Sequence, residues 1–227
     1  MSREILTIGE AMRLAAVLLV LVPAGHAVAQ ESSGTKLVVQ QGGREIGREE
    51  FTLSQGRGRG APGTSLQAIA RYPANTPTLQ LRATLDRTPE AALAKFQLDV
   101  EGPNGPTVIL AAGSGARLII RTVAKGSEAG RELPGGPDVV LLDDNVFSLY
   151  VAVADLATPN GKALTAVFPR TARRASFVAR RDPGGGGGGS RVTLTGDIRG
   201  TLATDAQGRL LRLELSESGT VVTRAQD

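Results

Sequence analysis

Residues 139–156 constrain the fold most, because they hold the one convincing helical pattern in a chain that otherwise predicts strands. The first four residues are continuously apolar, which is typical of a strand buried on both faces. Asp143, Asp144 and Asn145 follow and offer the side-chain oxygens that cap the start of a helix. The apolar residues after them have helical spacing, so we expect one helix over about residues 145–156, packed against a sheet.

The rest of the chain alternates polar and apolar residues between short turns, as in residues 79–86 and 96–101. This pattern predicts a mainly β fold with about ten or eleven strands, which are largely antiparallel because the connections are short. The twist that accumulates over so many strands bends a sheet. We therefore expect a half-barrel or open barrel with the helix packed on it.

Glycines interrupt the strand pattern at several places. Residues 55–64 and 125–137 are rich in glycine and charge, and we interpret both as loops. Residues 184–189 are six consecutive glycines, which predict a flexible hairpin loop. Ile46 and Phe51 are both candidate inward residues but are five positions apart, so a β-bulge near Gly47 is expected to restore the alternation.

The N-terminal segment has the pattern of a secretory signal peptide. Two arginines precede a short apolar run, residues 14–22, and small residues precede a cleavage site after Ala29. The run is far shorter than the roughly 20 residues that span a bilayer. We expect residues 1–29 to be removed, leaving residues 30–227 as a single β-rich domain in the periplasm or outside the cell, with no transmembrane segment.

The residue types that are absent narrow the possible chemistry. The sole histidine is His26, within the predicted signal peptide, and there is no cysteine. The sequence therefore predicts no catalytic histidine or cysteine, no metal site of imidazole or thiolate ligands, and no cofactor. Asp143 and Asp144 are adjacent, as are Glu49 and Glu50, and neighbours on a strand point to opposite faces. A carboxylate-dependent hydrolase is accordingly the least favoured function.

Charge and aromatic content give no support for nucleic-acid binding. The net charge is only +4, and the chain has two tyrosines, five phenylalanines and no tryptophan on which bases could stack. Arg57 and Arg59 lie in a glycine-rich setting, which is more typical of a solvated loop. Contact with an anion such as a lipid headgroup is the alternative for these two arginines.

The predicted signal peptide, the run of strands and the helix after Leu141-Leu142-Asp143-Asp144-Asn145 together resemble a known fold. It is the half-barrel of periplasmic lipoprotein carriers and of mycobacterial-type lipid-binding lipoproteins. The pattern is also similar to the β-rich N-terminal modules of some secreted bacterial hydrolases and exported proteins of unknown function. The resemblance covers most of residues 36–224. It implies that the concave face holds an acyl chain without catalysis.

Two functions follow as hypotheses. The first is an exported, non-catalytic half-barrel that binds a hydrophobic ligand, such as a lipid acyl chain, or a lipidated partner. The second is a structural or protein-interaction module of the cell envelope, with a filled core and no small-molecule ligand. A cavity open to solvent would favour the first function. The candidate wall of such a cavity is the apolar face of the helix, namely Val146, Phe147, Leu149, Tyr150 and Val153.

Overall fold

A computed structural model describes residues 34–183 and 188–226 of the chain. The predicted signal peptide lies outside these residues, as do residues 184–187 of the glycine run. The run connects β11 (Arg173–Arg181) to β12 (Ser190–Gly196), and these two strands pair antiparallel, so the run spans a hairpin connection. Within the described ranges, no helix has the length and apolar character needed to cross a membrane.

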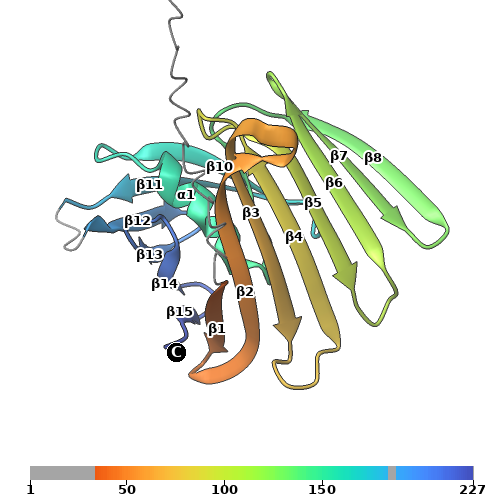
Figure 1. Cartoon of the computed structure of the whole chain (residues 1–227), viewed down its shortest axis with the longest axis horizontal. Helices are drawn as coiled ribbons and strands as arrows, with labels where there is room; N and C mark the ends of the chain where they lie inside the picture. The colour runs from red at the N-terminus through yellow and green to blue at the C-terminus, as the bar shows by residue number, and fades with distance from the viewer. Residues whose placement is uncertain (1–33, 184–187, 227) are drawn as a thin grey trace, which may run out of the picture. The chain divides into compact units, whose positions relative to one another are not determined.

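The fold is mainly β, as the sequence predicted, and the described strands form one sheet (Figure 1). Every neighbouring pair is antiparallel except β9 and β10, which are parallel. The strands run in the order β8-β7-β6-β5-β4-β3-β2-β1-β15-β14-β13-β12-β11-β10-β9, so β8 and β9 are the two edges and the sheet does not close into a barrel. The remaining strands are β1 (Thr35–Gln41), β2 (Arg44–Arg57), β3 (Ala61–Tyr72), β4 (Leu79–Arg87), β5 (Leu93–Glu101), β6 (Thr107–Ser114), β7 (Arg117–Ala124), β8 (Ser127–Pro134), β9 (Val139–Leu141), β10 (Lys162–Phe168), β13 (Gly200–Thr204), β14 (Leu210–Leu215) and β15 (Thr220–Arg224).

The predicted count of ten or eleven strands was too low, since the described residues contain fifteen. The segment 125–137, expected to be a loop, contains β8, which pairs with β7 along its whole length. Most of the segment 55–64 also belongs to strands, because β2 continues to Arg57 and β3 begins at Ala61. Only a short 3-10 turn, η1 (Gly58–Gly60), separates them.

The predicted bulge in β2 is confirmed. Val39 pairs with Gly47 and the next residue, Gln40, pairs with Glu45, which leaves Ile46 as the extra residue. As a result Gly47, Glu49 and Phe51 lie on the buried face of β2.

The helical segment lies inside the curl of the sheet (Figure 1). It starts later than expected, as the 3-10 helix η2 (Phe147–Tyr150), and continues as α1 (Val151–Leu156). The helix α1 packs against β11, β12 and β13, whereas η2 packs against β2 and β14. Because this segment is apolar on nearly all sides, it is buried from Val146 to Ala154, in one continuous core with the inward residues of the strands.

Candidate functional site

A buried carboxylate on β2 holds the start of the helical segment. The backbone N–H of Phe147 donates to Glu49 Oε2 at 2.7 Å, and the N–H of Ser148 donates to Glu49 Oε1 at 3.0 Å. These are two of the N–H groups that a helix start leaves without an intrahelical acceptor. The predicted cap was therefore wrong: a residue 98 positions away performs the role assigned to the Asp143–Asn145 stretch.

The environment of Glu49 changes its acidity. The side chain is 2 % exposed, and burial raises its pKa to about 7. The hydrogen bonds from Ser148 and Phe147 act in the opposite direction but do not outweigh the loss of water. The negative charge of Asp143 adds slightly to the increase. Glu49 is thus a buried structural acid rather than a surface carboxylate.

Asp143 forms a second buried polar contact beside the first. The Arg170 guanidinium donates to both of its carboxylate oxygens, at 2.8 and 2.9 Å, and a third bond of 2.7 Å reaches Asn145 Oδ1. Asp143 also accepts from the backbone N–H of Asn145 at 2.9 Å. The aspartate therefore fixes the turn before the helix to the β10–β11 connection.

Tyr72 completes this polar cluster from β3. Its hydroxyl donates to the backbone carbonyl of Asn145 at 3.0 Å, and burial, together with the negative charges of Glu49 and Asp143, raises its pKa. Its ring occupies space that a side chain at Gly47 would need, since a Cβ there would lie 2.2 Å from the ring. A glycine at this bulge thus allows Tyr72 to reach the helical segment.

The far end of the helix is held by two arginines. Arg87 at the end of β4 is 5 % exposed and forms an ion pair with Asp155. Arg181 on β11 donates to the carbonyl oxygen of Ala154 at 3.0 Å, one of the carbonyls that the end of a helix leaves unpaired. Polar contacts from four strands, β2, β3, β4 and β11, and from the β10–β11 connection therefore anchor the helical segment.

The five residues expected to form a cavity wall lie in the core. Val146, Phe147, Leu149, Tyr150 and Val153 are between 0 and 4 % exposed. Of these five, Tyr150 also borders a shallow hollow of about 270 Å³, where charged side chains of both signs meet. The helix-facing part of the concave face is thus filled by side chains.

The two arginines expected to lie in a mobile loop are near the β2–β3 connection. Arg57 donates to the carbonyl oxygen of Pro62 at 2.7 Å, which stabilises this tight connection. Arg59 lies in η1 between two glycines. Contact with an anion at these residues stays a prediction.

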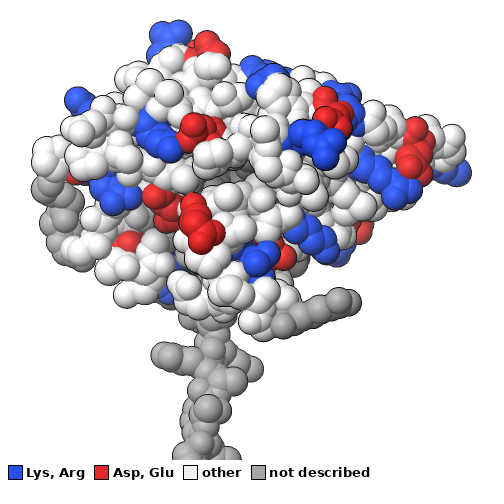
Figure 2. Space-filling view, turned by 90° about the horizontal axis from the view of Figure 1, so that it is seen from above, with Lys and Arg blue, Asp and Glu red and all other residues white. Residues whose placement is uncertain are grey.

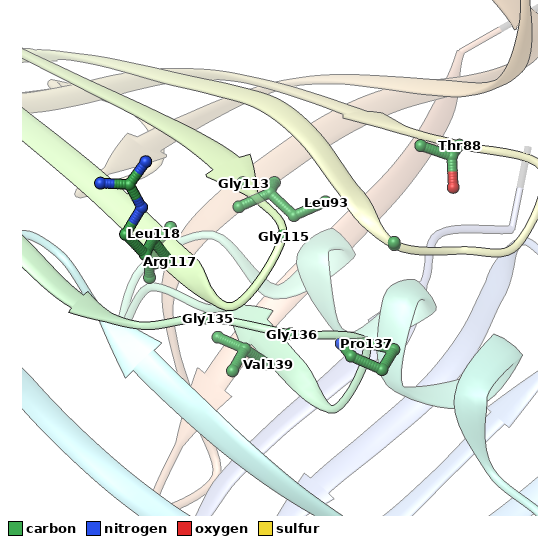
Figure 3. A pocket seen from close by; sticks show the side chains of 11 residues that line it. Thr88, Leu93, Gly113, Gly115, Arg117, Leu118, Gly135, Gly136, Pro137 and Val139 are labelled. Carbon is green, nitrogen blue, oxygen red and sulfur yellow. The ribbon is translucent and has the colours of Figure 1, made fainter.

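Two cavities lie at opposite ends of β6. The first, which we call the glycine cavity, has a volume of about 280 Å³. Figure 3 shows it between the β6–β7 turn and the segment leading to β9, with Leu93, Leu118 and Val139 nearby and the Arg117 guanidinium pointing away from the gap. At two of its glycines, Gly113 and Gly135, a Cβ would come within 2.6 Å of backbone atoms of neighbouring segments. The backbone segments around this cavity therefore approach one another closely.

The second, which we call the arginine cavity, has a volume of about 500 Å³. Its floor is the apolar inward face at the ends of β4, β5 and β6, and its other side is the β10–β11 connection. Arg131 and Arg170 are its charged residues, and no acidic residue lines it. The described lining residues are Leu79, Val100, Gly102, Pro103, Asn104, Gly105, Thr107, Ile109, Thr122, Ala129, Arg131, Pro169, Arg170 and Ala172.

Arg131 belongs to the concave face although it is exposed. It pairs directly with Ile120 on β7, and opposite residues of an antiparallel pair point to the same face. Ile120 is buried in the core, so Arg131 extends toward the interior of the curl at the edge strand. Nothing in the sequence singled it out, because β8 was not predicted as a strand.

Elsewhere on the surface, charges of both signs are mixed. Figure 2 shows basic and acidic side chains interspersed over one face of the molecule. Among residues 34–183 and 188–226, no group of three or more histidine, cysteine or acidic side chains could hold a metal ion. The arginine cavity, with its volume of about 500 Å³ and its apolar floor, is the best candidate for a binding site.

Comparison with known proteins does not assign the chain to a family. No protein-family description matches the sequence, and no curated protein matches it. Among solved structures, a DUF1089 family protein from Pseudomonas aeruginosa is similar, with 12% sequence identity and a TM-score of 0.42 over 92% of this chain and 98% of that chain. So distant a similarity carries no argument about function.

Proposed function

We propose that the protein is an exported, non-catalytic β half-barrel that binds a hydrophobic ligand, such as a lipid acyl chain, or a lipidated partner. The arginine cavity is the observation that carries this proposal. Its volume of about 500 Å³ lies within the range of roughly 300–1,000 Å³ typical of ligand sites. Its floor of Leu79, Val100 and Ile109 is apolar, as such sites generally are.

The position of the cavity also suits a ligand. It lies toward the free edge of the sheet, where β8 is paired on one side alone and is largely exposed. A ligand could therefore enter at the β8 edge, away from the strands β11 to β14 against which the helical segment packs. Binding of the ligand would bury apolar surface that is open to water in the free protein.

Native mass spectrometry of the purified protein tests the proposal, since a bound lipid would add a discrete mass. Added fatty acid should also raise the melting temperature with concentration, because a ligand at about 100 times its Kd stabilises the folded state by roughly 2.7 kcal/mol. Ala129→Trp should fill the cavity from β8 and abolish this shift. Glu128→Trp, which places the same ring on the opposite face of the strand, is the matched control. A panel of fatty acids and phospholipids that produces no shift would contradict the proposal.

A structural or protein-interaction module of the envelope is the second candidate. It is favoured by the helix-facing part of the concave face, where Val146, Phe147 and Leu149 leave no room for a ligand. If no lipid co-purifies and none shifts the melting temperature, this function is the better explanation.

Export is tested separately from binding. N-terminal sequencing of the mature protein should begin at Gln30 or within a few residues of it. A mature product that retains residues 14–22 would contradict a cleaved signal peptide.

A further inference from the structure

We infer that the arginine cavity selects amphiphiles that carry an acidic headgroup, and that Arg131 contacts that group. This inference rests on the proposed function, and it names the chemical class of the ligand: an acyl chain that ends in an anionic oxygen group. The inference rests on two observations: the charged residues that line the cavity, and the ion pairs that some of them already form.

Arg131 has no partner to neutralise it. Within residues 34–183 and 188–226 it forms no ion pair and no hydrogen bond with another side chain. Its acidic neighbours on β8 point to the opposite face, where Glu128 pairs with Arg121 at 2.7 Å and Glu132 pairs with Arg117 at 3.7 Å. The alternation of the strand thus separates Arg131 from the nearest carboxylates.

Arg170, the other arginine of the cavity, is in a different position. Asp143 binds its guanidinium through two oxygens and offsets its charge. Arg170 is therefore committed to holding the turn before the helix. The lining then carries one uncompensated positive charge, that of Arg131, and no acidic residue to oppose an anion.

The position of Arg131 on an edge strand does not by itself explain why its charge is positive. An inward-pointing charge discourages an edge strand from pairing with another chain, and a glutamate would do this equally well. A positive charge beside a cavity that has an apolar floor and no carboxylate in its lining has a further consequence. It complements a ligand whose chain lies on Val100 and Ile109 and whose anionic oxygens face β8, because charge-assisted hydrogen bonds from a guanidinium favour carboxylate and phosphate.

Calorimetric titration of the full protein with four probes tests this inference. Palmitate and monopalmitoyl phosphatidylglycerol carry an anionic group, whereas hexadecanol and monopalmitoyl phosphatidylcholine have the same chain length with no net charge. The wild type should bind at least one anionic probe about tenfold or more tightly than its neutral counterpart, a difference of about 1.4 kcal/mol. Preference for palmitate would identify a free fatty acid as the ligand, and preference for the glycerol lipid would identify a phospholipid.

Arg131→Gln should reduce the preference to less than about threefold, a residual of roughly 0.7 kcal/mol, while binding of the neutral probes is retained. Arg121→Gln, the control, removes a charge of the same sign on the adjacent strand but on the outer face, and should leave the preference unchanged. Size-exclusion chromatography of each variant shows whether altered pairing between copies of the chain at the β8 edge contributes to a change in lipid binding.

The outcomes separate the two proposals. Equal affinity for anionic and neutral probes in the wild type would overturn the acidic-headgroup inference and leave the proposed function standing. A preference that survives in Arg131→Gln would overturn the role of Arg131. Failure of every probe to bind would overturn the proposed function, and the inference with it.

Discussion

Replacing Glu49 by glutamine should change how the stability of the protein depends on pH. Burial raises the pKa of this carboxyl from its ordinary value of 4.5 to about 7, so the folded chain holds the proton more tightly than the unfolded chain does. The stabilisation from this proton is complete below about pH 4.5 and is lost as the pH rises to about 7. At about 1.36 kcal/mol per pKa unit, the whole effect is roughly 3 kcal/mol.

The measurement is the free energy of unfolding in urea, followed by circular dichroism, at about pH 5 and about pH 8. Glutamine does not titrate, so we compare the free energy of unfolding of the wild type with that of Glu49→Gln. The difference between the two isolates the contribution of this group from that of the other carboxylates. The difference should fall by about 2–3 kcal/mol between the two pH values. Glu50→Gln, which changes the exposed neighbour, should show no such trend. A Glu49→Gln difference that does not vary with pH would refute the argument from burial.

Glu49→Ala tests the capping contacts in the same assay. It leaves the buried N–H groups of Phe147 and Ser148 without an acceptor, at a cost of about 1–3 kcal/mol each. We therefore expect a loss of roughly 2–6 kcal/mol at about pH 5. The loss should be smaller by about 2–3 kcal/mol at about pH 8, because alanine, like glutamine, does not titrate. A loss at about pH 5 below about 0.5 kcal/mol, less than an ordinary helix cap contributes, would show that the helical segment does not depend on this carboxylate.

Two further substitutions test the packing around the helical segment. Gly47→Ala should lower the free energy of unfolding in urea by about 1–3 kcal/mol, because the added methyl overlaps the Tyr72 ring. The control is Gly130→Ala, in a strand with open space around it, which should leave the free energy of unfolding nearly unchanged. Equal effects of the two substitutions would mean that the ring moves aside freely. Asp155→Ala should lower stability by about 1–3 kcal/mol, since it leaves the buried Arg87 guanidinium without its carboxylate, and a neutral result would show that solvent replaces the aspartate.

The fold class was predictable because inward residues alternate along most strands. The exception is β8, whose sequence Ser-Glu-Ala-Gly-Arg-Glu-Leu-Pro is exposed over nearly its whole length and so has no apolar alternation to recognise. Residues 55–64 were mistaken for a loop for a related reason, since glycine weakens the strand pattern even where pairing continues. Local sequence predicts a strand when one face is buried, and fails where neither face is.

The candidate site was much less predictable than the fold. The sequence did show that Glu49 and Glu50 face opposite ways, and the structure confirms this, with Glu49 buried and Glu50 exposed. It could not show that Glu49 turns inward to cap a helix 98 residues later, because that contact depends on the bulge at Ile46 and on the curl of the sheet. Asp143 is of a residue type that often caps helices, but its carboxylate instead accepts two hydrogen bonds from Arg170, which is a stronger, bidentate partner.

The way in which the helix is anchored explains where a ligand could bind. Glu49 from β2 and Arg87 from β4 hold the two ends of the helical segment against the sheet, and breaking either contact would leave a buried polar group unpaired. A ligand that displaced the helix would have to offset the free-energy cost of leaving these polar groups unpaired before its own binding became favourable. The arginine cavity lies mostly on β5 to β8, strands that make none of these contacts, and Arg170 borders it from the β10–β11 connection. A ligand of the kind proposed would therefore leave the contacts of Glu49 and Arg87 in place, and would lie beside Arg170 while that arginine keeps its bonds to Asp143.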